Sequence, residues 1–266
     1  MDTVIIAIIS ITAIGAVAAA VLSVASKIMH VAVDERMTKI SAALPGTNCG
    51  ACGYPGCAGY ASALIENADV KSNLCTPGGA EVVGKISEIL GKDGEAAESK
   101  YAVVHCGGDA DAQQKKMEYH GIKTCYAAAT VFCGEGACAY GCIGYGDCAL
   151  VCPEDAVCID NGLARINPIR CTGCGLCVKA CPHHIISVEK TASKTHIICS
   201  NIERGAAARK RCTKCCIGCG KCARECPEKA IHMENNLARI DYQKCVGCGH
   251  CAEICPTTAV SFSGCL

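Results

Sequence analysis

The chain has 266 residues, no formal net charge and 28 cysteines. So high a cysteine content is typical of a disulfide scaffold in a short secreted chain. The tight Cys-x-x-Cys spacings argue against that class, because neighbouring thiolates converge on one metal or cluster. With no Trp and only two Phe, an ordinary aromatic core is not expected, and a metal would stabilise the fold instead.

The first expected element is a membrane helix within an anchor at residues 1–30. Val4 to Ser26 carries no charge and would reach about 34 Å as a helix, enough to cross a bilayer. A signal peptide is not favoured, because the basic segment that should precede the apolar run is missing. A buried core helix is not favoured either, because no globular domain surrounds this segment. The flanking Lys27, Arg36 and Lys39 predict a cytoplasmic C-terminal end and hence a single-pass protein of the inner membrane.

A small cysteine-rich domain is expected at residues 31–78. Its thiols are Cys49, Cys52, Cys57 and Cys75, with glycines between the first three that let the backbone wrap closely around a ligand. A linker at residues 79–131 would hold one amphipathic helix and a small α/β segment.

The remaining chain contains a block that repeats after 74 residues and predicts two ferredoxin-like units, at 132–190 and 191–266. In each copy a turn pair, Asn161-Gly162 or Asn235-Asn236, lies between short apolar alternations and predicts a tight hairpin. Each unit is therefore expected to be α+β.

Each copy carries two cysteine runs that end in Cys-Pro. The first copy has Cys138, Cys142, Cys148 and Cys152, then Cys171, Cys174, Cys177 and Cys181. The second copy has Cys212, Cys216, Cys222 and Cys226, then Cys245, Cys248, Cys251 and Cys255. The later run of each copy matches the bacterial ferredoxin spacing, in which three cysteines hold one 4Fe–4S cluster and the fourth binds the partner cluster. We therefore expect Cys181 to complete the cluster of the earlier run, and Cys152 that of the later run. By the same rule Cys255 and Cys226 exchange in the second copy.

The spacing does not decide which of two cysteines is the remaining ligand in the earlier run of the second copy. Cys216, Cys219 and Cys222 fit the standard run, whereas register with the first copy favours Cys212 over Cys219.

Five 4Fe–4S clusters are expected, with room for a sixth built from Cys106, Cys125, Cys133 and Cys199, although simple packing is the default for such cysteines. Zinc is the alternative metal, but four-cysteine zinc sites seldom show three cysteines at two-residue gaps followed by Cys-Pro. Between Glu203 and Lys229 the local net charge is +5, which suits an acidic electron carrier or an ordinary solvated face. No interleaved aromatics accompany it, so nucleic-acid binding is not expected.

In this order of parts the chain resembles the B-type subunit of the Rnf complex, an ion-translocating ferredoxin:NAD oxidoreductase, over essentially its whole length. The most specific segments are Asn48 to Cys57 and Ala137 to Cys148. The resemblance implies a membrane complex that couples electron transfer between reduced ferredoxin and NAD to sodium or proton movement. This iron–sulfur subunit would accept electrons from ferredoxin and pass them to the other membrane and peripheral subunits.

The flavin and NAD sites of that family lie on other subunits, and this chain shows no Gly-x-Gly-x-x-Gly loop and no catalytic residue of its own. Two alternatives are an iron–sulfur subunit of another membrane oxidoreductase and a zinc-binding, membrane-tethered module without a redox role. Together these inferences predict an α+β protein with one N-terminal transmembrane helix, a small 4Fe–4S domain and two tandem two-cluster units.

Overall fold

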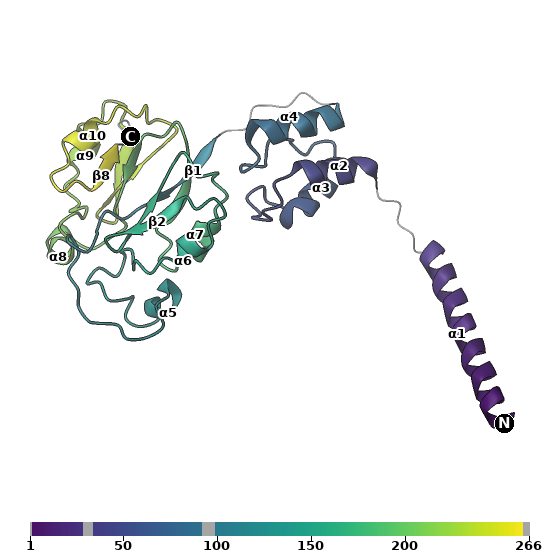
Figure 1. The fold of residues 1–266 in the computed structure, drawn as a ribbon. Helices are drawn as coiled ribbons and strands as arrows, with labels where there is room; N and C mark the ends of the chain where they lie inside the picture. The colour runs from purple at the N-terminus through teal and green to yellow at the C-terminus, as the bar shows by residue number, and fades with distance from the viewer. Residues whose placement is uncertain (1, 29–33, 92–98, 263–266) are drawn as a thin grey trace.

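The computed structural model describes residues 2–28, 34–91 and 99–262. Parts of the predicted anchor and linker, residues 29–33 and 92–98, lie outside the described residues. Figure 1 shows a long N-terminal helix, a separate group of helices, and a larger body of short helices and paired strands.

The N-terminal helix forms as α1 (Asp2–Ile28). Nevertheless, within the described residues no helix is both long and apolar enough to cross a membrane. The prediction of a single transmembrane helix is therefore wrong for the described chain.

Three helices form the N-terminal domain: α2 (Glu35–Ala43), α3 (Gly56–Glu66) and α4 (Gly79–Leu90). Asp34 caps α2 by accepting a hydrogen bond from the backbone N–H of Arg36. One core joins the three helices, and its fully buried members are Ile40, Tyr60, Ala61, Leu64 and Ile86. The amphipathic helix expected in the linker is α4, and its apolar face packs into this core.

The first unit, residues 99–190, consists of β1, α5, α6, the β2–β3 hairpin, α7 and β4. Their bounds are β1 (Lys100–Val104), α5 (Cys125–Ala129), α6 (Asp147–Leu150), β2 (Val157–Asp160), β3 (Leu163–Ile166), α7 (Leu176–Ala180) and β4 (Ile186–Lys190). Antiparallel β1 and β4 pair from Lys100↔Lys190 to Val104↔Ile186. β1, from the predicted linker, thus closes the sheet of this unit.

The second unit, residues 191–262, repeats the arrangement. Its elements are β5 (Thr195–Ile197), α8 (Gly205–Arg211), α9 (Lys221–Arg224), β6 (Ile231–Glu234), β7 (Leu237–Ile240), α10 (His250–Glu253) and β8 (Val260–Phe262). Here β5 pairs antiparallel with β8, as β1 does with β4. β5 is therefore the counterpart of β1.

Both predicted hairpins are confirmed. β2 pairs with β3 and β6 with β7, and each pair is joined by two residues. Positive φ angles at Asn161, Gly162, Asn235 and Asn236 are those of a type I′ turn, whose twist matches that of the strands.

Candidate iron–sulfur sites

The four cysteines of the N-terminal domain form one group, called here the N-terminal quartet: Cys49, Cys52, Cys57 and Cys75. Burial raises the pKa of the Cys75 thiol, and the charges of the other three raise it further, so all four lie together. The loop is held by Asn48, which has a positive φ of 49° and accepts a hydrogen bond from the Cys57 N–H at 2.8 Å.

In the first unit, the loop before α7 carries Cys171 and Cys174, and the first turn of α7 carries Cys177. These three thiols face a thiol from the earlier run. Burial raises the pKa of Cys177 to about 11, and its thiol neighbours contribute in the same direction. Those neighbours are Cys171, Cys174 and Cys152. Cys152, which was predicted to cross to this group, thus lies beside the other three cysteines. These four cysteines are called the Cys171 quartet.

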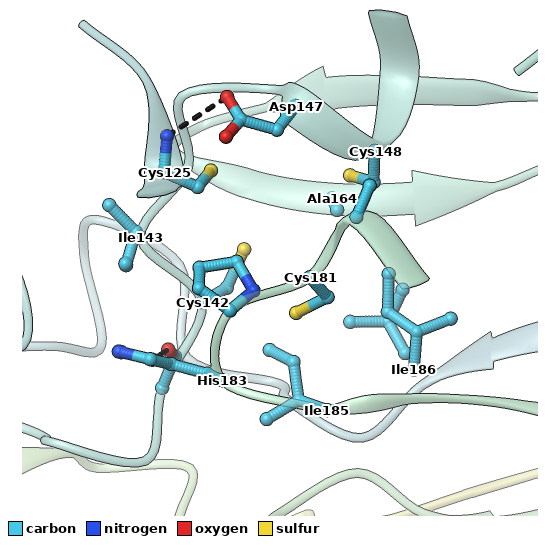
Figure 2. A pocket seen from close by; sticks show the side chains of 14 residues that line it. Cys125, Cys142, Ile143, Asp147, Cys148, Ala164, Cys181, His183, Ile185 and Ile186 are labelled. Carbon is cyan, nitrogen blue, oxygen red and sulfur yellow. Dashed lines mark hydrogen bonds between the residues drawn. The ribbon is translucent and has the colours of Figure 1, made fainter. Parts of the chain in front are cut away.

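The partner group of the first unit lines a cavity with about 350 Å³ of unfilled space. Figure 2 shows its four sulfur atoms turned toward one common space, and they belong to Cys125, Cys142, Cys148 and Cys181. Burial raises the pKa of Cys148 to about 12, with Cys142, Cys125 and Cys181 as its first three charge neighbours. These cysteines form the Cys142 quartet, in which Cys125 takes the place expected for Cys138.

Cys125 is held at this cavity by Asp147. The Asp147 carboxylate accepts hydrogen bonds from the backbone N–H groups of Cys125 and Tyr126 at 2.9 and 3.0 Å. Since Asp147 directly precedes Cys148, it ties the start of α5 to the cysteine loop.

The repeat explains why an outside cysteine is used. In the 74-residue register Cys219 falls opposite Tyr145, so the earlier run of the first unit lacks the middle cysteine of the standard spacing. Cys125 supplies a fourth thiol from elsewhere. The sequence did contain a signal for this, because the absence of a cysteine at position 145 of the duplicated run indicates that another cysteine must replace it.

In the second unit, the corresponding cavity has about 370 Å³ of unfilled space. Its lining cysteines, called the Cys216 quartet, are Cys216, Cys219, Cys222 and Cys255. Cys212 lies outside this lining. The structure thus brings together the three cysteines of the standard run and Cys255, which was predicted to cross to them.

The last group lines a cavity of about 360 Å³ and comprises Cys226, Cys245, Cys248 and Cys251. This is the Cys245 quartet, and it contains the predicted crossing of Cys226. The Ala230 N–H donates to Cys226 Sγ at 3.4 Å, as the Ala156 N–H does to Cys152 Sγ at 3.3 Å in the first unit. The two crossing thiols thus have equivalent surroundings.

The thiols surround spaces instead of meeting at a point. Among the described side chains, no group of three or more His, Cys, Asp or Glu residues is arranged around a single ion. A zinc ion would bring each sulfur to about 2.3 Å from one centre, whereas a four-iron cube takes one thiolate at each of four separate irons. Four thiolates placed around a space, instead of around one point, fit the cube.

Five of the predicted cysteines lie outside the five quartets. Cys138 and Cys212 line a further cavity together with Cys106 and Cys199, whereas Cys133 lines none of the cavities named above. The predicted grouping of Cys106, Cys125, Cys133 and Cys199 is not brought together, since Cys125 belongs to the Cys142 quartet.

Neighbouring quartets also approach one another. Among the charges that raise the pKa of Cys174, after burial, is that of Cys49 from the N-terminal quartet. The Lys179 ammonium donates to the Cys49 carbonyl oxygen at 2.7 Å and joins the same two parts of the chain. Within the units, Cys177 acts on Cys148 and Cys222 acts on Cys251.

Three protein-family profiles match the chain. "Putative Fe-S cluster" covers residues 44–77, "4Fe-4S binding domain" covers residues 164–187, and "4Fe-4S dicluster domain" covers residues 216–259. Fold, cysteine geometry and these profiles define an iron–sulfur protein of the 4Fe–4S class.

Curated relatives place the chain within that class. It is 38% identical to the B-type subunit of the Na(+)-translocating ferredoxin:NAD(+) oxidoreductase complex of Acetobacterium woodii, over 84% of this chain and 67% of that protein. It is 40% identical to the proton-translocating counterpart of Clostridium ljungdahlii, over 91% and 85%. It is 34% identical to the B-type subunit of the ion-translocating oxidoreductase complex of Methanosarcina acetivorans, over 72% of each.

The chain belongs to the family of the B-type subunit of the Rnf complex. It is an iron–sulfur electron-transfer subunit of the ferredoxin:NAD oxidoreductase complex, and one subunit alone lacks a full active site.

Proposed function

We propose that this chain relays electrons one at a time from reduced ferredoxin to the other subunits of an Rnf-type complex. The five quartets hold 4Fe–4S clusters, which supply one-electron acceptance and release when bound. The N-terminal quartet is the exit, and the second unit receives the electrons.

The proposed ligands are twenty cysteines in five groups. They are Cys49, Cys52, Cys57 and Cys75; Cys152, Cys171, Cys174 and Cys177; Cys125, Cys142, Cys148 and Cys181; Cys216, Cys219, Cys222 and Cys255; and Cys226, Cys245, Cys248 and Cys251. This set uses Cys125 and Cys219 in place of Cys138 and Cys212, on the basis of the cavities that they line.

The observation that carries the relay is the approach of two quartets that are distant in sequence, which the hydrogen bond from the Lys179 ammonium to the Cys49 carbonyl oxygen joins at 2.7 Å. Cys49 is a charge neighbour of Cys174, although 125 residues separate them. Electron tunnelling falls steeply with distance, so neighbouring sites exchange electrons far faster than separated ones. The N-terminal quartet is thus adjacent to the pair of sites in the first unit.

The second unit has the features of a docking site for an acidic carrier. Cys219 and Cys248 are exposed, so two of its sites lie near the surface. Lys221 and Arg224 on α9 are exposed beside Cys219, and Arg224 donates to the Cys219 carbonyl oxygen at 3.0 Å. Positive charge around an exposed site steers an acidic ferredoxin to it.

We place the cysteine-rich part at the cytoplasmic face of the inner membrane, in contact with the other subunits of the complex. Relatives of this chain are subunits of sodium-translocating and proton-translocating complexes. Reducing conditions on that side keep the thiols available for iron.

The relay is tested by replacing Cys49 with Ala in the assembled complex. The second unit should still be reduced by ferredoxin, because its ligands are unchanged, whereas reduction of NAD by the whole complex should fall to background. Electron paramagnetic resonance of the reduced clusters measures the first quantity, and NADH absorbance measures the second.

The matched control is Cys158→Ala, which changes an exposed cysteine on β2 outside the quartets. It should leave both quantities unchanged. Normal NAD reduction in the Cys49→Ala complex would show that electrons bypass the N-terminal quartet, and the serial relay would then be rejected.

A further inference from the structure

Cysteines that the five quartets leave unused converge between the two units. Cys106 and Cys138 of the first unit and Cys199 and Cys212 of the second line one cavity, here called the junction cavity. Like the three quartet cavities described above, it is lined by at least four cysteines.

The sulfur atoms share this space closely. A Cβ added at Gly108 would lie 3.0 Å from Cys212 Sγ and 3.8 Å from Cys106 Sγ. Cys138 is a charge neighbour of Cys106, of Cys199 and of Cys212. All four thiols are therefore close to one another, although they come from four separate loops.

The junction cavity has the symmetry of the repeat. Cys138 and Cys212 are 74 residues apart. Cys106 lies two residues after the end of β1, and Cys199 lies two residues after the end of its counterpart β5. Each unit thus contributes two corresponding positions, one after its first strand and one at the start of its earlier cysteine run.

Hydrogen bonds at the four sulfurs repeat in the same way. Cys106 Sγ accepts from the Cys142 N–H at 3.3 Å, and the Cys199 thiol has a backbone bond with Cys216, which is the equivalent residue. The thiols of Cys138 and Cys212 have backbone bonds with Tyr140 and Lys214, which are also 74 residues apart. Such bonds to sulfur stabilise thiolates and tune the potential of iron–sulfur clusters.

Further polar groups lie in the lining of the cavity or act on its cysteines. The Asn201 amide, whose residue is 1% exposed, donates to Cys138 Sγ at 3.5 Å. Arg211 and Lys214 bring positive charge, while Glu203 and Asp109 are their ion-pair partners at 2.8 and 2.6 Å. Cysteines that serve only in packing need no such polar shell.

We propose that Cys106, Cys138, Cys199 and Cys212 hold a sixth 4Fe–4S cluster, shared by the two units at their junction. The site itself depends on these four thiols alone, while its role as a bridge rests on the proposed relay. Cys215 also lines the cavity, but its position in the first unit is Gly141, so it breaks the symmetry and is not assigned as a ligand.

The position of the junction cavity gives the site its role. It adjoins the Cys142 quartet through Cys106 and the Cys216 quartet through Cys199. One electron would be taken from the reduced Cys216 site, which is thereby oxidised, and passed to the Cys142 site, which is thereby reduced. Ferredoxin supplies the electron, and no further reactant is needed.

The site is tested by measuring the iron and acid-labile sulfide content of the full chain after purification without oxygen. Six sites predict about 24 iron and 24 sulfide per chain, whereas five predict about 20 of each. A content near 20 overturns the sixth site and leaves the five-site relay intact. A content near zero overturns both.

Replacing one ligand from each unit locates the additional iron. Cys106→Ser/Cys199→Ser should lower the content from about 24 to about 20 iron and remove one spin system from the reduced resonance spectrum. In stopped-flow reduction by ferredoxin, the second unit should be reduced at the normal rate and the first unit much more slowly.

The matched control, Cys158→Ser/Cys215→Ser, also removes two cysteines, one of which lines the junction cavity. It should keep the full iron content, and a loss of four iron there would overturn the ligand assignment. If the Cys106/Cys199 variant loses most of its iron through misfolding, the content of the unsubstituted chain decides between the two counts.

Discussion

Single residues decide which thiols meet in each cavity, and Cys125 shows how. It reaches the Cys142 quartet from α5 because Asp147 binds the backbone N–H groups at the start of that helix. In the second unit the same place is filled by Cys219, from within the run itself. Two local solutions therefore build the same kind of site in the two copies.

This equivalence predicts a rescue experiment. Cys125→Ser should remove about four iron per chain, because the Cys142 quartet loses a ligand. Adding Tyr145→Cys places a thiol where Cys219 stands in the second unit and should restore the iron, at the cost of the hydrogen bond from Tyr145 to Glu135. Iron and sulfide analysis measures both steps.

Tyr145→Cys alone serves as the control and should keep the iron content of the unsubstituted chain. If Cys125→Ser retained all its iron, Cys125 would not be a ligand. If the double variant failed while folding normally, the proposed equivalence of positions 145 and 219 would be incorrect.

At the scale of elements, each hairpin supports a cysteine loop. A Cβ at Gly144 would lie 2.3 Å from the carbonyl oxygen of Gly162 at the β2–β3 turn. The equivalent Gly218 would place its Cβ 2.8 Å from the carbonyl oxygen of Asn236 at the β6–β7 turn. The loop and the turn can approach so closely only because glycine has no side chain.

We therefore expect Gly144→Ala to destabilise the first unit by about 1 to 3 kcal/mol, from the clash and from its φ of 85°. Lower thermal stability and faster iron loss on dilution should accompany it. The control is Gly84→Ala in α4, where a Cβ meets nothing within 4 Å, and it should be neutral or slightly stabilising. Equal behaviour of the two variants would contradict close packing at the turn.

These elements also show what the sequence can predict. Local spacing and turn residues are visible in the sequence. They predict the repeat, the two hairpins and most members of the quartets. The use of Cys125 and the meeting of Cys106 with Cys199 depend on contacts between distant loops, which spacing alone does not reveal. The apolar N-terminal run predicted a helix, and α1 forms, but no helix in the described residues is both long and apolar enough to cross a membrane.

At the scale of the whole molecule, the two units are joined by a buried polar contact as well as by cysteines. His196 of β5 is 1% exposed and lies between two tyrosines, with Tyr101 of the first unit 2.5 Å from Nε2 and Tyr242 of the second 2.9 Å from Nδ1. Burial lowers the pKa of His196 to about 4, and nearby His105 lowers it further.

This shift predicts how stability depends on pH. The unfolded chain takes up a proton on His196 near pH 6.5, whereas the folded chain resists it until about pH 4. The free energy of unfolding should therefore fall by about 1.4 kcal/mol for each pH unit between about 6.5 and 4 from this group alone. Thermal unfolding followed by circular dichroism at pH 7.5 and 5.5 measures the difference.

In His196→Phe the free energy of unfolding should depend less on pH, whatever the stability of the variant at pH 7.5. His232→Phe, at an exposed position on β6, is the control and should keep the dependence of the unsubstituted chain. An unchanged slope in His196→Phe would assign the acid sensitivity to other groups.

The small cores of the molecule bear on how the cell makes it. The buried clusters of both units contain cysteines among alanines and short aliphatic side chains, with Cys148 and Cys177 in one and Cys251 in the other. Removing the inorganic part would leave these interiors largely hollow, because metal binding and folding are one process in such domains. Biogenesis of this subunit is therefore governed by the supply of iron and sulfide, and a shortage of either should appear first as degraded polypeptide and only afterwards as slower electron flow.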